Sequence, residues 1–358
     1  MNAQPVQDLP EFAHWLNAAP QTLTELRGCP LALVFVNAAS VWCAQRLAEL
    51  AQWQQRNPGQ LQVLVLQVPR FDFERQPEAA LKLLRRQGLA APALLDADWD
   101  GWRRFGVTAW PTVVLLDAQG RERGRMVGLG QPGELERLLG QVLAAGPRAA
   151  VVPVTERQPE PRQLLRFPTG LAVTEDRLYI ADSGHHRILE CSHGGRILRQ
   201  FGLGTPDLVD GGSAEAAFNR PHALVAVREA LYVADTGNHA LRRINLITGQ
   251  VDTLCGNGRP GRPIEGPVGQ AHAVSLDHPM GLAFADNQLH VAMAGDNCIW
   301  SFHLGQRALQ WRAGSGTIEQ RDGSGHLAAF AQPCALAVVQ QVLYVADALG
   351  ASVRSLQL

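Results

Sequence analysis

Cysteine is the residue type in this chain with the clearest potential for chemistry. A thiol–disulfide exchange centre needs two thiols at C-x-x-C spacing on a helix N-terminus, where backbone amides and the helix dipole stabilise a thiolate. The six cysteines are scattered and form no such pair: Cys29, Cys43, Cys191, Cys255, Cys298 and Cys334. Their spacing predicts neither a zinc site nor a disulfide scaffold.

A recurrent aspartate is the second candidate. Asp182, Asp235 and Asp347 each end an apolar strand pattern such as LYVAD, whereas Met293 occupies the same place in a fourth segment. Carboxylates at one shared position could surround a calcium ion in a hydrolase, but Met293 would leave such a ring incomplete. We therefore interpret the aspartates as turn residues that accept backbone hydrogen bonds. The sequence predicts no metal site and no cofactor.

Composition limits the classes of partner. The chain has 358 residues, of which 46% are hydrophobic and 18% charged, and its formal net charge is −1. A nearly neutral chain has no overall attraction for nucleic acid or for an anionic membrane. The first twenty residues lack a signal-peptide pattern, and no apolar run approaches the ~20 residues of a membrane span. We therefore expect a cytoplasmic protein whose partners are proteins.

The segment before residue 150 alternates strand and helix patterns, which is typical of an α/β domain. The run 31–36 (LALVFV) is short, apolar and β-branched and predicts a buried strand. The remaining expected elements are a helix over 44–55, a strand over 61–68, a helix over 77–86, a hairpin from 113–117 and 121–127, and a closing helix over 134–143. We place this domain at 1–143.

An internal repeat governs the second half of the chain. Residues 144–163 are rich in Ala, Pro and charge and predict a linker, after which four similar units cover 164–358. Pro168, Pro221, Pro279 and Pro333 begin the units and lie 53, 58 and 54 residues apart. This period, with several short strands and glycine turns per unit, predicts the blades of an all-β propeller.

The sequence does not determine how, or whether, the propeller ring closes. The chain ends at Leu358, before a fourth strand of the last blade. Four blades could close with the help of an N-terminal strand such as 163–166, blades could be missing, or two open half-rings could associate. An open stack would therefore leave surfaces for self-association.

The repeat units resemble NHL repeats. The resemblance covers 164–358 and rests on motifs that recur in register, such as LYVADTGNH at 231–239 and the Asp-Gly … Phe … Pro stretches at 210–221 and 322–333. The NHL family implies a six-bladed propeller that binds proteins or, in some members, RNA. Only four units are visible in this chain.

Residues 9–143 resemble the thioredoxin-like domain that is fused to NHL repeats in NHL-repeat-containing thioredoxin-like proteins. The segment FGVTAWPT at 105–112 is similar to the stretch in which thioredoxins carry a cis-proline before a strand, so Pro111 is expected to be that proline. The fold class expected for the whole chain is an α/β thioredoxin-like domain followed by an NHL-type propeller.

The resemblance leaves two registers for the redox centre, in the segment NAASVWCAQRLAEL at 37–50. Without a gap, Ser40 occupies the position of the nucleophilic sulfur and Cys43 that of the resolving one. With three inserted residues, Cys43 becomes the nucleophile and Arg46 replaces its partner. We prefer the ungapped register, in which Ser40 also caps the following helix and Cys43 is poorly exposed. Either register lacks the second thiol.

Recognition is therefore the function that the sequence favours. We expect a protein-interaction scaffold that docks partners on a propeller face, with Ser40, Cys43 and Pro111 as degenerate site positions. Trp42, Trp110 and Thr112 could line a peptide groove beside them, although core packing is the preferred role of the nearby tryptophans. The alternative is a monothiol oxidoreductase or redox sensor that uses Cys43, so that any enzymatic activity would be thiol–disulfide exchange.

Overall fold

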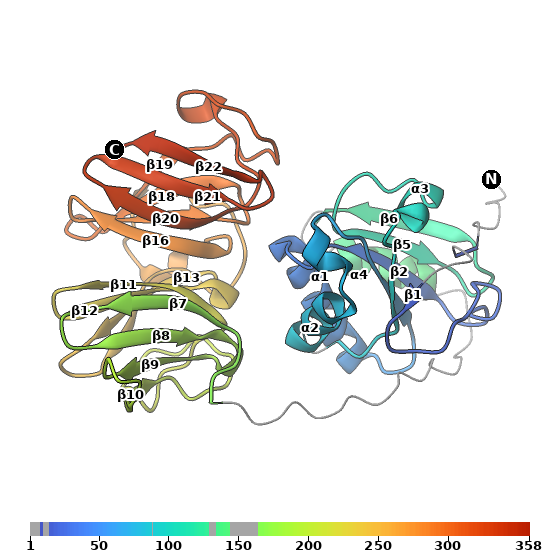
Figure 1. The fold of residues 1–358 in the computed structure, drawn as a ribbon, viewed down its shortest axis with the longest axis horizontal. Helices are drawn as coiled ribbons and strands as arrows, with labels where there is room; N and C mark the ends of the chain where they lie inside the picture. The colour runs from blue at the N-terminus through green and yellow to red at the C-terminus, as the bar shows by residue number, and fades with distance from the viewer. Residues whose placement is uncertain (1–7, 10–13, 88, 129–133, 144–163) are drawn as a thin grey trace. The chain divides into compact units, whose positions relative to one another are not determined.

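The computed structural model describes residues 8–9, 14–87, 89–128, 134–143 and 164–358. The chain divides into two compact units, Met1–Pro159 and Glu160–Leu358. Figure 1 shows the α/β elements of the first unit and the sheets of the second. The expected linker at 144–163 lies outside the described residues, so its structure stays a prediction.

The first unit is built on one mixed sheet with strand order β1-β4-β3-β2-β5-β6. Strand β2 pairs in parallel with β3 and antiparallel with β5, which places it at the centre. All six residues of β2 are buried, because both faces of the sheet are covered. The strands are β1 (His14–Trp15), β2 (Leu31–Val36), β3 (Gln62–Gln67), β4 (Ala93–Leu95), β5 (Thr112–Leu116) and β6 (Glu122–Val127).

Two apolar clusters lie on the two sides of this sheet. One gathers alternate residues of β2 with the apolar sides of the long helices, and the other contains the remaining β2 residues with Phe105 and the nearby tryptophans. Alternation along a strand explains the division, since successive side chains point to opposite faces. The helical elements are α1 (Val41–Arg56), η1 (Asp72–Arg75), α2 (Pro77–Gln87), α3 (Asp100–Arg104) and α4 (Glu134–Leu143).

The second unit is a β-propeller-like arrangement of four antiparallel sheets, which we call blades one to four in chain order. The expected repeat units each form one blade. Blade one is β7 (Pro168–Val173), β8 (Leu178–Asp182), β9 (Arg187–Cys191) and β10 (Ile197–Phe201), and blade two is β11 (Pro221–Val227), β12 (Ala230–Asp235), β13 (Ala240–Asn245) and β14 (Val251–Cys255). Blade three is β16 (Pro279–Ala285), β17 (Gln288–Met293), β18 (Cys298–His303) and β19 (Ala308–Ala313) with the short β15 (Gly266–Pro267), and blade four is β20 (Pro333–Val339), β21 (Val342–Asp347) and β22 (Ser352–Gln357).

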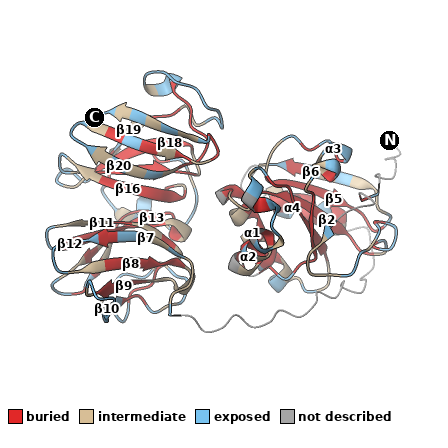
Figure 2. Cartoon of the chain, viewed as in Figure 1, coloured by how far each residue is buried: buried red, intermediate tan, exposed pale blue. Residues whose placement is uncertain are grey.

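Neighbouring blades pack through their first strands: β7 contacts β11, β11 contacts β16, and β16 contacts β20. Exposed residues recur along β7, as Figure 2 shows, and along β22, so the four described blades form an open stack. The expected closing strand is not formed over 164–166, and residue 163 lies outside the described residues. Blade four consequently keeps three strands.

A side chain at each of the three junctions links the backbones of adjacent blades. In blades one to three, the residue after the turn between the second and third strands has a left-handed backbone, and its side chain accepts a hydrogen bond from the N–H of the residue before the next blade's proline. Ala351 occupies the equivalent place in blade four and has no side-chain acceptor. The three bonds are Arg220 N–H to His186 Nδ1 (3.1 Å), His278 N–H to His239 Nδ1 (3.2 Å) and Gln332 N–H to Asn297 Oδ1 (3.1 Å).

Candidate functional site

Ser40 lies at the N-terminus of helix α1, where thioredoxin-like chemistry would be located. Its hydroxyl oxygen accepts the backbone N–H of Cys43 at 3.4 Å, so Ser40 is the N-cap of the helix. Its side chain is buried, with a residue exposure of 2%. The hydroxyl is therefore occupied in capping and is not presented to solvent as a nucleophile.

Cys43 is fully buried in the first turn of the same helix. Its sulfur accepts the backbone N–H of Asn37 at 3.3 Å. Burial raises the pKa of the Cys43 thiol to about 12, and the hydrogen bonds from Asn37 and Ser40 only partly oppose this shift. At neutral pH the sulfur is a protonated thiol inside the core, which is a poor nucleophile.

Cys43 has no second sulfur within bonding reach. All six cysteines are free thiols. The nearest cysteine in sequence, Cys29, precedes strand β2, and its sulfur lies 3.8 Å from the carbonyl oxygen of Gln60. Cys43 follows the other end of that strand, and six residues of extended chain span roughly 20 Å. A Cys29–Cys43 disulfide is therefore incompatible with this fold.

The loop that leads into helix α1 is held by a buried glutamate that sequence reasoning missed. Glu74 comes from η1, which precedes the helix expected over 77–86. One carboxylate oxygen accepts from the side chain of Asn37 (2.8 Å) and from the N–H groups of Arg70 (2.7 Å) and Phe71 (3.0 Å). The other accepts from the N–H of Ala39 at 3.1 Å. This carboxylate fixes the loop before Ser40 in one conformation.

Pro111 lies at the start of β5, and the Trp110–Pro111 peptide bond is cis, as expected from the resemblance. The following Thr112 is buried, and its hydroxyl donates to the carbonyl oxygen of Ala109 at 2.7 Å. Trp42 is also buried. Of the three side chains expected to line a groove, only Trp110 is therefore partly exposed, because Trp42 and Thr112 face the packed interior.

Trp110 forms an aromatic cluster with Trp99 and Trp102. The ring centroids are 5.2 Å apart for Trp99–Trp102, 5.3 Å for Trp99–Trp110 and 4.7 Å for Trp102–Trp110. All three side chains are half-buried and pack against the apolar cluster on one side of the sheet. The indole N–H of Trp99 donates to Pro69, whereas that of Trp110 has no acceptor among the described residues. The cluster is part core and part surface.

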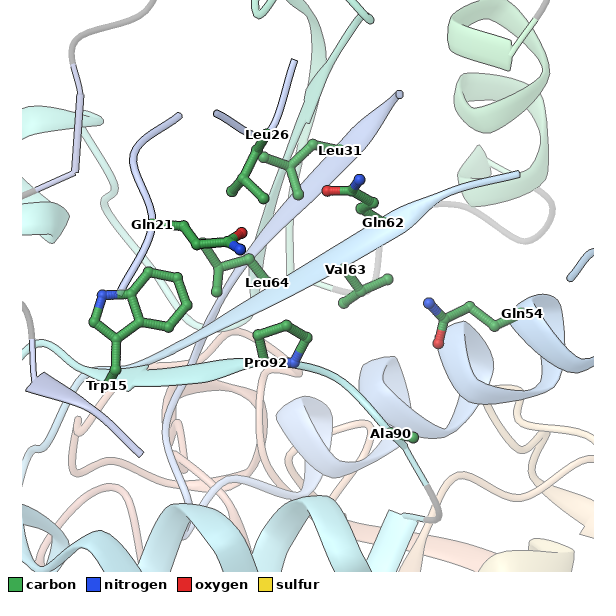
Figure 3. A pocket seen from close by; sticks show the side chains of 10 residues that line it. All are labelled: Trp15, Gln21, Leu26, Leu31, Gln54, Gln62, Val63, Leu64, Ala90 and Pro92. Carbon is green, nitrogen blue, oxygen red and sulfur yellow. The ribbon is translucent and has the colours of Figure 1, made fainter. Parts of the chain in front are cut away.

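A small pocket lies elsewhere in the first unit. Figure 3 shows that its wall combines Trp15, Gln21 and Gln54 with residues at the beginnings of β2 and β3. Leu31, at the beginning of β2, lines this pocket, whereas Ser40 follows the end of that strand. The pocket is therefore separate from the segment that carries Ser40 and Cys43.

The recurrent aspartates are hydrogen-bonded within their own blades. Asp235 accepts the backbone N–H of Asn219 at 2.8 Å and lies 2.9 Å from the guanidinium of Arg242, with both side chains fully buried. The others follow the same plan, in which the carboxylate accepts a backbone N–H from the segment that leads into the blade: Arg166 for Asp182 (2.7 Å) and Ala331 for Asp347 (2.9 Å). These carboxylates hold the ends of β8, β12 and β21.

Sequence spacing did not reveal one group of potential metal ligands. Among the described residues, His239, Asp277 and His278 each place one ligand atom within 4.8 Å of the others. The potential ligand atoms of these residues already make hydrogen bonds within the protein, however. His239 Nδ1 accepts the N–H of His278, and Asp277 Oδ1 lies 2.7 Å from His278 Nδ1. These bonds explain the cluster as a junction between blades two and three.

The fold is a thioredoxin-like α/β domain followed by a β-propeller-like arrangement of four sheets. A family model for the thioredoxin-like domain matches residues 22–143, and the NHL repeat model matches residues 165–191. No helix in the described part of the chain is long and apolar enough to cross a membrane.

The chain is homologous over almost its whole length to two curated proteins. It is 30% identical to Protein SUPPRESSOR OF QUENCHING 1, chloroplastic, of Arabidopsis thaliana, over 99% of this chain and 36% of that protein. It is 29% identical to NHL repeat-containing protein 2 of Homo sapiens, over 99% of this chain and 53% of that protein. The chain thus spans between about a third and a half of the length of these relatives. A solved thioredoxin-like protein in the oxidised form aligns with 40% of this chain and 98% of its own, at 23% identity and a TM-score of 0.36.

Proposed function

We propose that this chain is a protein-interaction scaffold in which the thioredoxin-like domain is a docking surface rather than a redox catalyst. The observation that carries the proposal is the state of Cys43. It is the only sulfur at the redox position, it is fully buried, and its pKa is raised to about 12. Dithiol exchange needs an exposed thiolate and a resolving partner, and this position offers neither.

The half-buried tryptophans supply the docking surface on the first unit. Trp99, Trp102 and Trp110 expose part of a continuous aromatic cluster next to Pro111. Large, rigid aromatic side chains bury much area at small entropic cost and are enriched where proteins bind. An apolar segment of a partner is the ligand that suits this cluster.

The loops between blades supply the second surface. Each loop connects the last strand of one blade to the first strand of the next, so in antiparallel sheets these loops share one end of the stack. Each carries an exposed apolar side chain, Leu203, Ile264 or Ile318. Function is often found on loops that a rigid scaffold presents. We propose this loop end as the propeller face that binds protein.

A monothiol sensor is the competing function, and the two can be separated with point variants of the full chain. The scaffold proposal expects Cys43→Ala to retain all co-purifying partners, measured by quantitative mass spectrometry. It expects the amount of partner that co-purifies with the Ile264→Asp variant to fall at least tenfold. Ile247→Asp is the matched control, because Ile247 is also an exposed isoleucine but lies in the turn between β13 and β14, at the opposite end of its blade.

An insulin reduction assay tests catalysis directly. The unchanged chain is expected to show no reduction of insulin disulfides above the rate of dithiothreitol alone. Loss of partners on Cys43→Ala, with trapping of a mixed disulfide in the unchanged chain, would instead support the sensor and contradict the scaffold.

A further inference from the structure

The hydrogen bond at the first blade junction fixes the tautomer of a histidine. His186 Nδ1 accepts the backbone N–H of Arg220 at 3.1 Å. A backbone N–H can only donate, so Nδ1 carries no proton and the neutral ring keeps its proton on Nε2. Burial, reinforced by the charges of Arg220 and Arg166, lowers the pKa of His186 to about 4, so the ring is neutral at pH 7. His186 therefore offers an Nε2–H donor on the side of the ring that the junction does not use.

The Nε2–H donor of His186 has no acceptor within the described part of the chain. The side chain of His186 is half-buried, whereas His239, which holds the equivalent place at the next junction, is 7% exposed. The turn that carries His186 connects the second strand of blade one to the third, so in an antiparallel sheet it shares one end of the blade with the inter-blade loops. Blade one therefore presents this donor at the loop end of the stack.

Two arginines lie beside this donor. The carbonyl oxygen of Arg166 accepts the N–H of Gly184, in the turn that precedes His186, at 2.8 Å. Arg220 adjoins the ring of His186 through its own backbone N–H. Burial and, among other charges, that of Arg220 lower the pKa of His239, so Arg220 lies near the histidines of both blades. Positive charge is therefore concentrated at the junction of blades one and two.

The carboxylate closest in sequence to this donor is used inside its own blade. Asp182 is completely buried. Its oxygens accept the N–H of Arg166 at 2.7 Å and the guanidinium of Arg187 at 2.8 Å, and His185 Nδ1 lies 2.8 Å from the second oxygen. Arg187 therefore compensates the charge of Asp182 within blade one.

An exposed apolar side chain lies next to the same turn. The loop after β10 runs along it, because a Cβ at Gly202 would lie 3.2 Å from the carbonyl oxygen of His186 and one at Gly204 would lie 3.5 Å from that of His185. Leu203, between the two glycines, is 56% exposed. The turn thus combines a hydrogen-bond donor and positive charge with a neighbouring apolar side chain.

Acidic side chains limit this region toward blade three. Asp277 Oδ1 lies 4.0 Å from Nδ1 of His239 and 2.7 Å from that of His278. Burial and the charge of Asp277 raise the pKa of the neighbouring Asp296 to about 7. Because like charges repel, an anion is disfavoured at the junction of blades two and three and favoured at that of blades one and two.

We propose that the junction between blades one and two binds a carboxylate side chain of an acidic segment in a partner protein. The inference rests on the proposed binding face at the loop end and names the chemistry of its ligand. The Nε2–H of His186 donates to the carboxylate, and the guanidinium groups of Arg166 and Arg220 supply the opposite charge. Leu203 packs against an apolar residue next to the acidic one.

The distribution of charge favours an acidic peptide over a nucleic acid as the ligand. A nucleic acid would extend its regular row of phosphates over the next junction, where Asp277 and Asp296 repel it. A peptide can place one carboxylate at the first junction and uncharged residues beyond it. The exposed side chains of Leu203 and Ile264 suit such uncharged residues.

Fluorescence anisotropy with the full 358-residue chain tests the proposal. The probe is a fluorescein-labelled peptide of alternating glutamate and leucine, and the matched neutral probe carries glutamine in place of glutamate. We expect the acidic probe to bind at least about tenfold more tightly than the neutral one, and its affinity to fall as salt is added, because exposed charges are screened.

Arg220 tests the contribution of charge. Arg220→Gln should weaken binding of the acidic probe by about tenfold, since a charge-assisted contact is lost. Arg228→Gln is the matched control, because it removes the same charge at an exposed position in the turn between β11 and β12, at the opposite end of the blade. It should leave the affinity unchanged.

His186 tests the hydrogen-bond donor. His186→Asp keeps an acceptor for the N–H of Arg220 but replaces the Nε2–H donor with a carboxylate, so the preference for the acidic probe should vanish. His186→Asn keeps an acceptor and restores a donor, as Asn297 does at the third junction, and should recover most of the lost affinity. Cooperative thermal melting of each variant checks that the fold is retained.

Equal binding of the acidic and neutral probes would overturn the proposal. So would an affinity for the acidic probe that Arg220→Gln and His186→Asp leave unchanged. Failure of the scaffold as a whole has a different signature, since Ile264→Asp would then keep its co-purifying partners. Partners that Ile264→Asp loses and Arg220→Gln keeps would leave the scaffold standing and contradict the acidic ligand.

Discussion

The backbone N–H of Asn37 donates to the sulfur of Cys43 at 3.3 Å, and the sulfur is completely enclosed by protein. Asn37 in turn donates through its side chain to Glu74 at 2.8 Å. The thiol thus belongs to a structural network that positions the loop before helix α1. In this protein the sulfur at the redox position contributes to the fold.

Restoring the missing sulfur tests the register that places Ser40 at the nucleophile position. Ser40→Cys should create a C-x-x-C pair with Cys43 at the N-terminus of α1. We expect a disulfide to form on mild oxidation, so that both thiols disappear from a titration performed in denaturant. The double variant Ser40→Cys/Cys43→Ala is the control and should form no such bond. Two persistently free thiols in Ser40→Cys would contradict the ungapped register.

The buried carboxylate of Glu74 should be essential for the order of the loop that precedes helix α1. Its oxygens accept four hydrogen bonds, and Glu74→Gln would place an NH₂ group against some of the donors. Hydrogen bonds to a charged group contribute about 1.5–3 kcal/mol each, so we expect a loss of about 3 kcal/mol in the free energy of unfolding. Hydrogen exchange at Ala39 and Phe71 should accelerate. Glu78→Gln on the exposed side of α2 should have neither effect.

His239 should make the propeller sensitive to acid. Burial, with help from His278 and Arg220, lowers the pKa of His239 to about 2. The unfolded chain protonates this histidine below about pH 6.5, whereas the folded chain does not. The stability that the neutral ring contributes is therefore complete above pH 6.5 and is lost as the pH falls toward 2. At about 1.4 kcal/mol per pH unit, the loss at pH 5 is about 2 kcal/mol.

Blade three carries a different residue at the position of His239, and this difference suggests the test. Asn297 accepts the equivalent hydrogen bond one blade later and does not titrate. His239→Asn should therefore keep the junction and reduce the difference in urea unfolding free energy between neutral pH and pH 5. His186, whose pKa burial lowers to about 4, contributes in the same direction, so some acid sensitivity should persist. His272→Asn, at an exposed position, should preserve the full dependence. An unchanged pH profile in His239→Asn would disprove the assignment.

The buried ion pair between Asp235 and Arg242 should behave as a unit. Blade three has Met293 and Trp300 at these two positions and needs no such pair. Asp235→Met alone would leave a buried guanidinium without that carboxylate, a loss of about 3–5 kcal/mol in the free energy of unfolding. Asp235→Met/Arg242→Trp should lose at least ~2 kcal/mol less than the sum of the single variants. Additive losses in urea unfolding would show that the pair is not coupled.

Local sequence patterns predicted the elements that are long or strongly apolar. The apolar run at 31–36 coincides with strand β2, and the repeat of proline and aspartate identified all four blades. Helix α1 begins at Val41 rather than at residue 44, because Ser40 caps it. Strand β4 was missed because three residues are too few for a pattern, and helix α3 is hardly longer.

The contacts that define the site could not be predicted from spacing. Glu74 lies 37 residues from Asn37, and nothing in its own segment indicates a carboxylate that faces inward. His186 has the left-handed backbone of a turn residue, but its hydrogen bond with the N–H of Arg220 crosses to another blade, which a local pattern does not reveal. Trp42 was expected beside a groove and is buried, since helical position alone does not show which side the sheet covers.

The joint between blades has an evolutionary consequence. In each joint a side chain of one blade binds a backbone N–H of the next, and every residue except proline supplies such a donor. Substitutions at the donor position therefore leave the joint intact as long as proline is avoided, and a duplicated blade would bring the same donor with it.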